Sequence, residues 1–165
     1  MNSVRELLEK RSAERPDEVF LEFGPQRVTY SQMDRRVNRA AAGLAAAGLG
    51  RGDRAALLVS NCPEFIYIWW GLFKLGAVMV PINLRLSASE AAYIIQHSKA
   101  RAVVVGSQSL GLLPELRAET QRAIRLAPPA AAPHMGPHVG VAPSYHGLEP
   151  LPREPLQSEE SANDG

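Results

Sequence analysis

The fold of this chain is decided by residues 61–83, NCPEFIYIWWGLFKLGAVMVPIN. Beyond Glu64 the only charged side chain in this stretch is that of Lys74, so the stretch is nearly long enough to cross a bilayer. A membrane span would have to carry Lys74 near its middle, which costs about 3 kcal/mol, and would have to continue through Gly76. These two residues argue against a membrane span.

Local signals instead divide the stretch into a helix and a strand. Asn61 is a suitable helix cap, Pro63 stands where a missing N–H costs little, and Gly76 is a typical left-handed stop. The β-branched run that follows, AVMV at 77–80, ends at Pro81 and predicts a buried strand. We therefore expect both elements in the core of a protein without a membrane span.

Helix and strand patterns also alternate on either side of this stretch. Before it, the pattern predicts a helix through residue 14 capped by Ser3, two short strands around Gly24-Pro25, a helix begun by Ser31 and Asp34, and a strand at 54–59. After it, the pattern predicts a helix at 87–97 with a Ser87/Glu90 capping box, a strand at 101–105 and a weaker helix at 112–124. Strands that alternate with helices over short links indicate an α/β fold, with parallel βαβαβ units preceded by a helix and a short hairpin.

Composition sets broad limits on function. The 165 residues carry 18 Lys+Arg against 17 Asp+Glu, so no overall field favours nucleic acid as a partner. A single cysteine, Cys62, precludes an internal disulfide, and the polar N-terminus does not resemble a secretory signal. We expect a cytoplasmic protein.

Composition also predicts a boundary near residue 126. Residues 1–126 form the predicted partial α/β subdomain, whereas residues 127–165 hold 8 of the 13 prolines and keep no helical or strand period. Because proline removes a backbone donor, this Pro/Ala-rich tail is expected to be extended or disordered and to stay out of the central sheet.

No group of residues stands out as a reactive site. The glycines of GLGRGD at 48–53 leave a helix and enter a strand, so they favour a helix end over a phosphate loop. Prolines interrupt the spacing of three tail histidines, which disfavours a metal site, and Cys62 is interpreted as a packing residue. The arginine-rich segment is interpreted as a solvated helix face and the tryptophan pair as core. The residues concerned are His134, His138, His146, Arg35, Arg36, Arg39, Arg51, Arg54, Trp69 and Trp70.

The order of segments resembles that of a known family. Thr29-Tyr30, GLGRGDRAALLVSNCPEF and GLFKLGAVMVPIN followed by RLSASE are similar to the N-terminal part of the adenylate-forming enzymes, which include acyl-CoA synthetases. The resemblance covers about residues 16–106, and within the family it points to the crotonobetaine/carnitine-CoA ligase branch. It implies the incomplete N-terminal part of that fold.

The resemblance also implies a reaction. In the family, a carboxylate attacks the α-phosphate of Mg·ATP to give an acyl-adenylate, and CoA then displaces AMP, so ATP, Mg²⁺, CoA and a small carboxylic acid belong to the complete enzyme. The family's phosphate loop, its lysine and its later catalytic segments have no match in this chain. No catalytic, cofactor-binding or metal-binding residue is therefore assigned, and the matching Gly76, Pro81 and Asn83 are expected to be architectural.

Three hypotheses remain open from the sequence. The first is a fragment of an AMP-forming acyl-CoA ligase that is inactive alone and self-associates through exposed sheet edges. The second is a non-catalytic α/β binding or regulatory module derived from the family. The third is a protein tethered to a membrane through residues 65–82.

Overall fold

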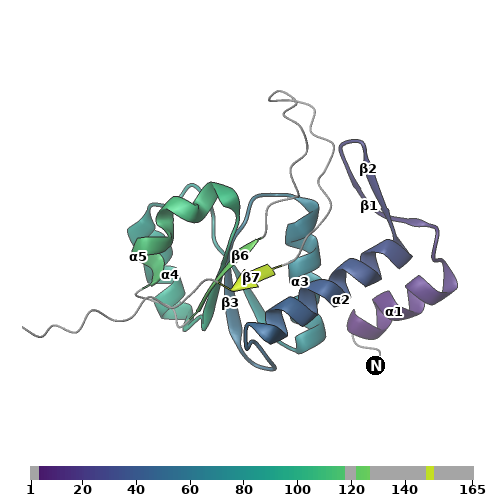
Figure 1. Cartoon of the computed structure of the whole chain (residues 1–165), viewed down its shortest axis with the longest axis horizontal. Helices are drawn as coiled ribbons and strands as arrows, with labels where there is room; N and C mark the ends of the chain where they lie inside the picture. The colour runs from purple at the N-terminus through teal and green to yellow at the C-terminus, as the bar shows by residue number, and fades with distance from the viewer. Residues whose placement is uncertain (1–3, 118–121, 127–147, 151–165) are drawn as a thin grey trace, which may run out of the picture.

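A mainly parallel sheet with helices on both faces forms the body of the structure, and a helix and a hairpin precede it (Figure 1). The computed structural model describes residues 4–117, 122–126 and 148–150. The elements are α1 (Val4–Glu14), β1 (Val19–Phe23), β2 (Gln26–Thr29), α2 (Tyr30–Ala46), β3 (Arg54–Leu58), α3 (Pro63–Leu75), β4 (Val78–Pro81), α4 (Ala88–Ser98), β5 (Ala102–Val105), the 3₁₀ helix η1 (Ser107–Leu112), α5 (Leu113–Arg117), β6 (Arg122–Leu126) and β7 (Leu148–Pro150). The predicted α/β fold class, with helix and hairpin first, is confirmed.

The order of strands in the main sheet is β4-β3-β5-β6-β7. Strand β3 pairs in parallel with β4 on one side and with β5 on the other, and β5 pairs in parallel with β6. The chain therefore moves outward from β3 to β4 through α3, and then returns past β3 to β5 through α4. The two crossovers run in opposite directions, so right-handed connections place α3 and α4 on opposite faces.

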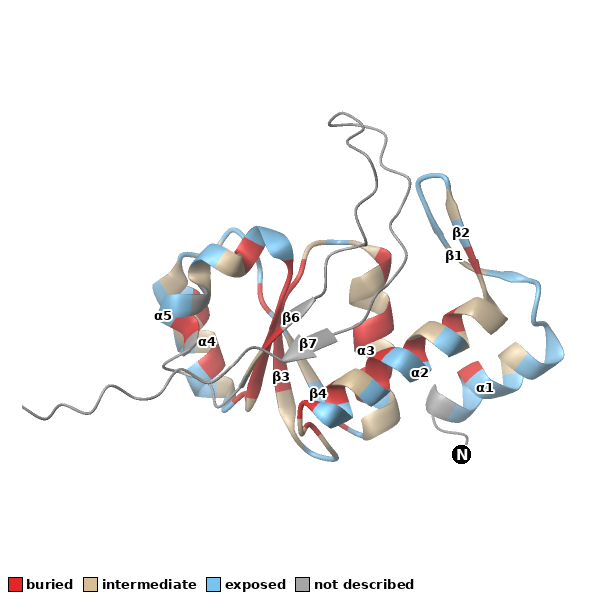
Figure 2. Ribbon diagram, in the orientation of Figure 1, coloured by how far each residue is buried: buried red, intermediate tan, exposed pale blue. Residues whose placement is uncertain are grey.

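Successive side chains of a strand point to opposite faces of the sheet, so a separate core lies on each face. Ala55 and Leu57 of β3 point to the side of α2 and α3, where Ile68 and Leu72 cover them. The intervening residues of β3 and β5 point to the side of α4, where Ile95 is central. Strands β3 and β5 are buried along most of their length (Figure 2), which explains their unbroken apolar sequences.

Helix α2 begins two residues earlier than the predicted capping box places it. Thr29 is the N-cap: its hydroxyl accepts a hydrogen bond from the Gln32 N–H, and the Gln32 side chain accepts one from the Thr29 N–H. The prediction that Ser31 and Asp34 start the helix is wrong, because this Thr/Gln pair forms the same kind of capping box two residues earlier. Ser3, the predicted cap of the first helix, lies outside the described residues.

The division of residues 61–83 into a helix and a strand is confirmed. Pro63 occupies the first turn of α3, and Gly76 ends the helix in the left-handed conformation at φ 68°. The predicted cap at Asn61 is wrong, because the N-cap is Cys62 and no side chain caps that end. Helix α3 stops after 13 residues, and none of the described helices combines the length with the hydrophobicity that a membrane crossing needs.

Strand β4 is not the buried strand that its composition predicts. It lies at the edge of the sheet, and the Val78 side chain is 50% exposed. Short runs of β-branched residues occur in both central and edge strands. The sequence therefore does not show which of the two β4 is, and only the strand order does.

The chain after β5 also differs from the prediction. Within the expected helix at 112–124 the structure has only the short helix α5, preceded by η1, and Arg122–Leu126 forms β6 beside β5. The tail does reach the sheet: Leu148–Pro150 pairs antiparallel with β6, at the edge, where proline is tolerated. The expectation that the tail stays out of the sheet is wrong for these three residues.

Candidate functional site

The topology places a candidate site at the carboxyl ends of β3 and β5. These strands are neighbours, yet the chain leaves β3 toward β4 and leaves β5 toward β6, in opposite directions. Open α/β sheets bind ligands at such a switch point, because the two departing loops leave a crevice between them. The loops here begin at Val59 and at Gly106.

The side chains at this switch point are small and neutral. Ser60, half-buried, and Asn61, exposed, follow β3, and Ser107, exposed, follows β5. The Gly106 N–H donates a hydrogen bond of 3.0 Å to the Leu58 carbonyl, which holds the two loops together. This arrangement offers hydroxyl and amide groups, and none of these three side chains carries a positive charge for a phosphate.

Cys62 lies in the same loop, and its thiol is held in the protonated form. Burial raises its pKa to about 11, and the nearby Glu64 carboxylate adds to the effect, while backbone hydrogen bonding acts in the opposite direction. The side chain packs against the core on the α3 face. Packing, as predicted, describes this residue better than nucleophilic chemistry.

The GLGRGD segment is a helix end and a turn, as predicted. Gly48 and Gly52 both have φ 81°, and the Gly50 N–H donates to Oδ2 of Asp53 at 2.9 Å. Asp53 also accepts a hydrogen bond of 3.0 Å from Arg101. A carboxylate thus occupies the turn, at the amino end of β3 and away from the switch point.

The arginine-rich helix face is only partly solvated. Arg35 and Arg39 are exposed, but Arg36 donates a hydrogen bond of 2.5 Å to the Tyr67 hydroxyl and lies 5.3 Å from the centre of its ring. Burial raises the pKa of Tyr67, and the Arg36 guanidinium opposes this rise. The contact between α2 and α3 was not predicted, since it joins residues 31 positions apart.

The two tryptophans have different surroundings. Trp70 packs with the core under the hairpin, where its ring lies edge-on to Phe20 at 5.8 Å. Trp69 is half-buried and lies in a row with Phe65 and Phe73 along the outer side of α3. The prediction of core packing is therefore confirmed for Trp70. Trp69 is only half-buried and contacts its aromatic neighbours on α3.

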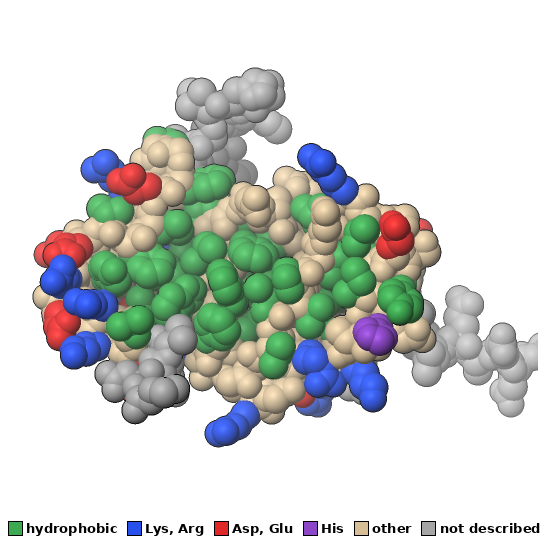
Figure 3. Space-filling view, turned by 180° about the vertical axis from the view of Figure 1, so that it is seen from behind, with side chains coloured by type: hydrophobic (Ala, Val, Ile, Leu, Met, Phe, Trp, Pro, Cys, Tyr) green, Lys and Arg blue, Asp and Glu red, His purple; other side chains and the backbone are tan. Residues whose placement is uncertain are grey.

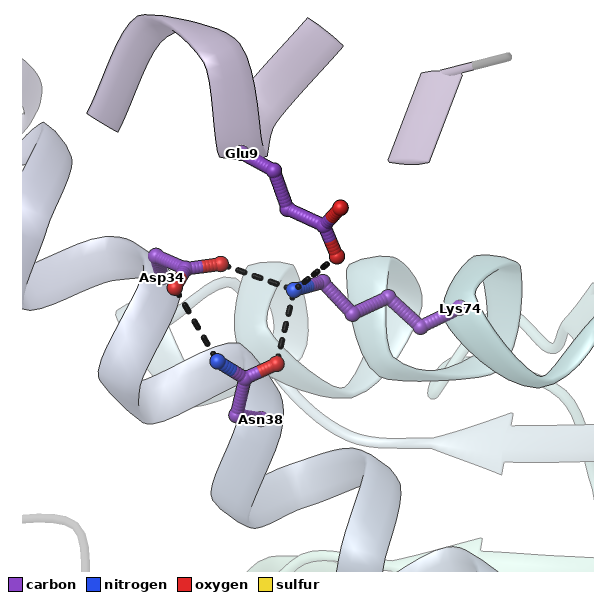
Figure 4. A network of polar contacts seen from close by, with 4 residues as sticks. All are labelled: Glu9, Asp34, Asn38 and Lys74. Atoms are coloured by element: carbon purple, nitrogen blue, oxygen red, sulfur yellow. Dashed lines mark hydrogen bonds and ion pairs between the residues drawn. The ribbon is translucent and has the colours of Figure 1, made fainter. Parts of the chain in front are cut away.

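Lys74 forms a polar network that links three helices (Figure 4). Its ammonium nitrogen lies 2.7 Å from Oδ1 of Asp34, 2.7 Å from Oδ1 of Asn38 and 3.1 Å from Oε1 of Glu9. Asn38 also donates a hydrogen bond of 3.0 Å to Asp34. The Lys74 side chain is only 7% exposed, so all three of its donors are used inside the protein. This network joins α1, α2 and α3 and is structural.

Two features of the described residues bear on ligand binding: the grouping of potential metal ligands and a surface hollow. No group of three or more His, Cys, Asp or Glu side chains comes together in the part of the chain that the structure describes. A surface hollow along α4 is lined by Leu86, Ser89, Glu90, Tyr93 and Ile94, a mainly apolar set whose one charge is negative. His134, His138 and His146 lie outside the described residues.

The motif residues that were expected to be architectural have structural contacts. Gly76 ends α3, its carbonyl accepts a hydrogen bond of 2.9 Å from the Gly52 N–H, and Pro81 ends β4. Asn83 turns the chain after β4, since its side-chain oxygen accepts a hydrogen bond of 3.0 Å from the Arg85 N–H.

The chain belongs to the AMP-binding enzyme family, which residues 8–164 match. Among its relatives is the crotonobetaine/carnitine–CoA ligase of Salmonella paratyphi B, 43% identical over 89 residues that make up 54% of this chain and 17% of that enzyme. The Escherichia coli enzyme of the same name is 39% identical over 99 residues, or 60% of this chain and 19% of that enzyme. The chain thus spans less than a fifth of these curated relatives.

Solved structures show the same fold. The N-terminal domain of FACL13 from Mycobacterium tuberculosis is 34% identical with a TM-score of 0.70, over 76% of this chain and 34% of that domain. A fatty acyl CoA synthetase from the same organism is 35% identical with a TM-score of 0.69, over 74% of this chain and 26% of the synthetase. The resemblance to adenylate-forming acyl-CoA ligases is confirmed.

Proposed function

We propose that this chain forms an N-terminal scaffold of an ATP-dependent, AMP-forming acyl-CoA ligase and supplies none of the catalytic residues. The complete enzyme would use a small carboxylic acid, ATP and CoA with Mg²⁺, in the cytoplasm. Crotonobetaine and carnitine are the first carboxylates to test, since the names of close relatives contain them.

The observation that carries this proposal is the family match over residues 8–164, combined with the neutral character of the switch point. Phosphoryl and adenylyl transfer develop negative charge, which backbone N–H groups, lysine and Mg²⁺ must stabilise. The side chains at the switch point are hydroxyl, amide and protonated thiol groups. A scaffold role fits them better than nucleotide binding.

The test is direct assay of the purified chain. Residues 1–165 are incubated with Mg·ATP, CoA and either carboxylate, and AMP and thioester are measured by liquid chromatography beside the Escherichia coli enzyme as positive control. We expect no AMP and no thioester above the enzyme-free blank, and no heat of ATP binding by calorimetry. Thioester made by residues 1–165 alone would contradict the proposal.

A non-catalytic module derived from the family is the second candidate, and the burial of the sheet favours it. Strands β3 and β5 are covered on both faces, so the chain already contains two cores. A single cooperative unfolding transition together with a monomeric elution volume would favour the module over a fragment. Self-association through exposed sheet edges would favour the fragment.

A further inference from the structure

Aromatic side chains form a row on the outer flank of α3. Phe65, Trp69 and Phe73 follow one another at four-residue spacing, with ring centres 6.3 Å and 5.6 Å apart. Helix α2 packs against a different flank, where the ideal Cβ position of Gly71 would lie 3.0 Å from the Ala41 nitrogen. The row lies on the side of α3 away from Gly71. Phe65 at its start packs partly against the core, whereas Phe73 at its end is 38% exposed.

The edge strand β4 follows this helix in the chain, and among the described strands it pairs only with β3, on one side. The Val78 N–H donates to the Asp53 carbonyl at 2.8 Å, and the Ile82 N–H donates to the Leu57 carbonyl at 3.0 Å. Backbone groups alternate sides along an extended strand, so Met79 directs its N–H and carbonyl away from β3. Pro81 has no N–H, which leaves Met79 as the outward donor within β4.

The helix row and the strand edge meet at one core: Phe65 of α3 and Met79 of β4 both pack, partly buried, against the same buried cluster. Strand β4 forms the edge of the sheet opposite to β7, which is drawn at the front in Figure 1. The view from behind shows a broad area of hydrophobic side chains with charged groups around its margins (Figure 3). A large apolar area rimmed by charges is typical of an interaction site.

We propose that this surface, the β4 face (Phe65, Trp69, Phe73, Val78 and Met79), binds further polypeptide of an adenylate-forming N-terminal domain. That polypeptide would add a strand beside β4, hydrogen-bonded to Met79, and would lay apolar side chains over the aromatic row. The inference rests on the proposed function and extends it to a partner.

The comparison with FACL13 is the argument for this occupant. The match takes in 76% of this chain but only 34% of that N-terminal domain, so about two thirds of the domain is polypeptide without a counterpart here. A second copy of this chain is a poorer fit. Two β4 strands pairing with each other would use one outward donor from each, and Pro81 would interrupt the ladder.

The test is complementation in trans. Tagged residues 1–165 are co-expressed with the Escherichia coli crotonobetaine/carnitine–CoA ligase from which the 99 matched residues have been removed. We expect a 1:1 complex on size-exclusion chromatography, in which the Met79 amide exchanges its hydrogen at least about tenfold more slowly than in the chain alone.

Matched variants locate the contact. Phe73→Glu and Val78→Glu, at side chains that are 38% and 50% exposed, should retain the fold by circular dichroism and reduce recovery of the partner at least about tenfold. Tyr93→Glu, at a side chain 64% exposed on α4, should leave recovery unchanged.

Three results would overturn the inference: no complex, a complex that the Phe73 and Val78 variants leave intact, or self-association of this chain through the β4 face in place of the complex. Thioester formation by the complex is measured separately. A complex that forms without making thioester counts against the ligase assignment and leaves the β4 face standing.

Discussion

The ammonium nitrogen of Lys74 lies 2.7 Å from Oδ1 of Asp34, a carboxylate 40 residues earlier in the chain. The charge that argues against a membrane span in residues 61–83 thus has a definite place in the fold. Lys74, on α3, forms one ion pair with Asp34 on α2 and another with Glu9 on α1. A lysine buried to this degree is retained because each of its donors has an oxygen partner.

Removing this charge should destabilise the protein. Lys74→Met keeps the apolar stem but leaves Asp34 and Asn38 without their cation, and we expect a loss of about 1–2 kcal/mol of unfolding free energy. The value stays moderate because Asp34 is 22% and Glu9 42% exposed, so water partly replaces the lost partner.

Urea denaturation followed by circular dichroism measures this loss. Lys10→Met is the matched control: Lys10 pairs with Glu14 at 3.7 Å, the two side chains are 60% and 45% exposed, and we expect a change within about 0.5 kcal/mol. Equal effects of the two substitutions would show that the Lys74 network adds no stability.

The left-handed end of α3 should tolerate only glycine well. Gly76→Ala forces φ 68° on a residue with a side chain and places Cβ 3.3 Å from Cγ of Arg51, so we expect a loss of about 1–2 kcal/mol. Gly50→Ala is the control, since Gly50 has a negative φ and nothing lies within 4 Å of its Cβ position. Thermal unfolding measures the stability of both variants. A Gly76→Ala protein as stable as the Gly50→Ala protein would contradict the argument.

The helix caps offer a test of the corrected boundaries. Ser87→Ala removes the hydroxyl that accepts from the Glu90 N–H and should cost about 1 kcal/mol, whereas Asn61→Ala should be nearly neutral because Cys62 is the N-cap of α3. Chemical denaturation of the two variants measures the difference. If Asn61→Ala lowers the unfolding free energy as much as Ser87→Ala does, Asn61 caps α3 as the sequence predicts.

The Ser87 cap also carries a pH dependence. Hydrogen bonds from the Ser87 backbone and hydroxyl hold the pKa of Glu90 below its ordinary value. Their contribution to stability is present above the pKa of Glu90 in the unfolded chain and is lost as the pH falls through its folded pKa. Glu90→Gln should therefore flatten the acid side of the stability curve, measured by urea denaturation between about pH 5 and pH 3.

Cys62 should make the protein less stable in alkali. Burial raises its pKa from 9.0 to about 11, so the folded state holds its proton at pH values where the unfolded chain releases it. The stability that this thiol contributes is complete below about pH 9 and is lost as the pH rises through 11.

The measurement compares the denaturation midpoints of the parent protein and of Cys62→Ala between pH 8 and pH 11. The comparison separates the contribution of the Cys62 thiol from that of Tyr67, whose pKa is raised as well. We expect the two curves to converge as the pH rises. Parallel curves would mean that the thiol is not desolvated in the folded state. Alkylation of the parent protein by iodoacetamide at pH 8 should likewise be slow until it unfolds.

Most elements of the fold follow from local patterns. The alternation of apolar runs with capped segments predicts α1, the hairpin, the body of α2, β3, α3, α4 and β5, because helix and strand periods and the Ser87 cap act over a few residues. The errors at Ser31 and Asn61 are also local. Competing polar residues stand within two positions of each true cap, and the sequence does not say which will be used.

The candidate site was harder to predict than the elements. The switch point between β3 and β5 depends on strand order, and the apolar sequences of β3, β4 and β5 are too similar to reveal it. The Arg36–Tyr67 contact and the Lys74 network join positions 31 or more apart, so no window of sequence contains both partners.

The sequence by itself determined the α/β class, the division of residues 61–83 at Gly76 and the family resemblance, since each rests on neighbouring residues or on segment order. Only the tertiary structure decided that β4 is an edge, that Arg122–Leu126 is a strand and that Lys74 is paired. Those outcomes depend on which distant segments pack together, and the packing energy of a strand or a charge is set by its neighbours in space.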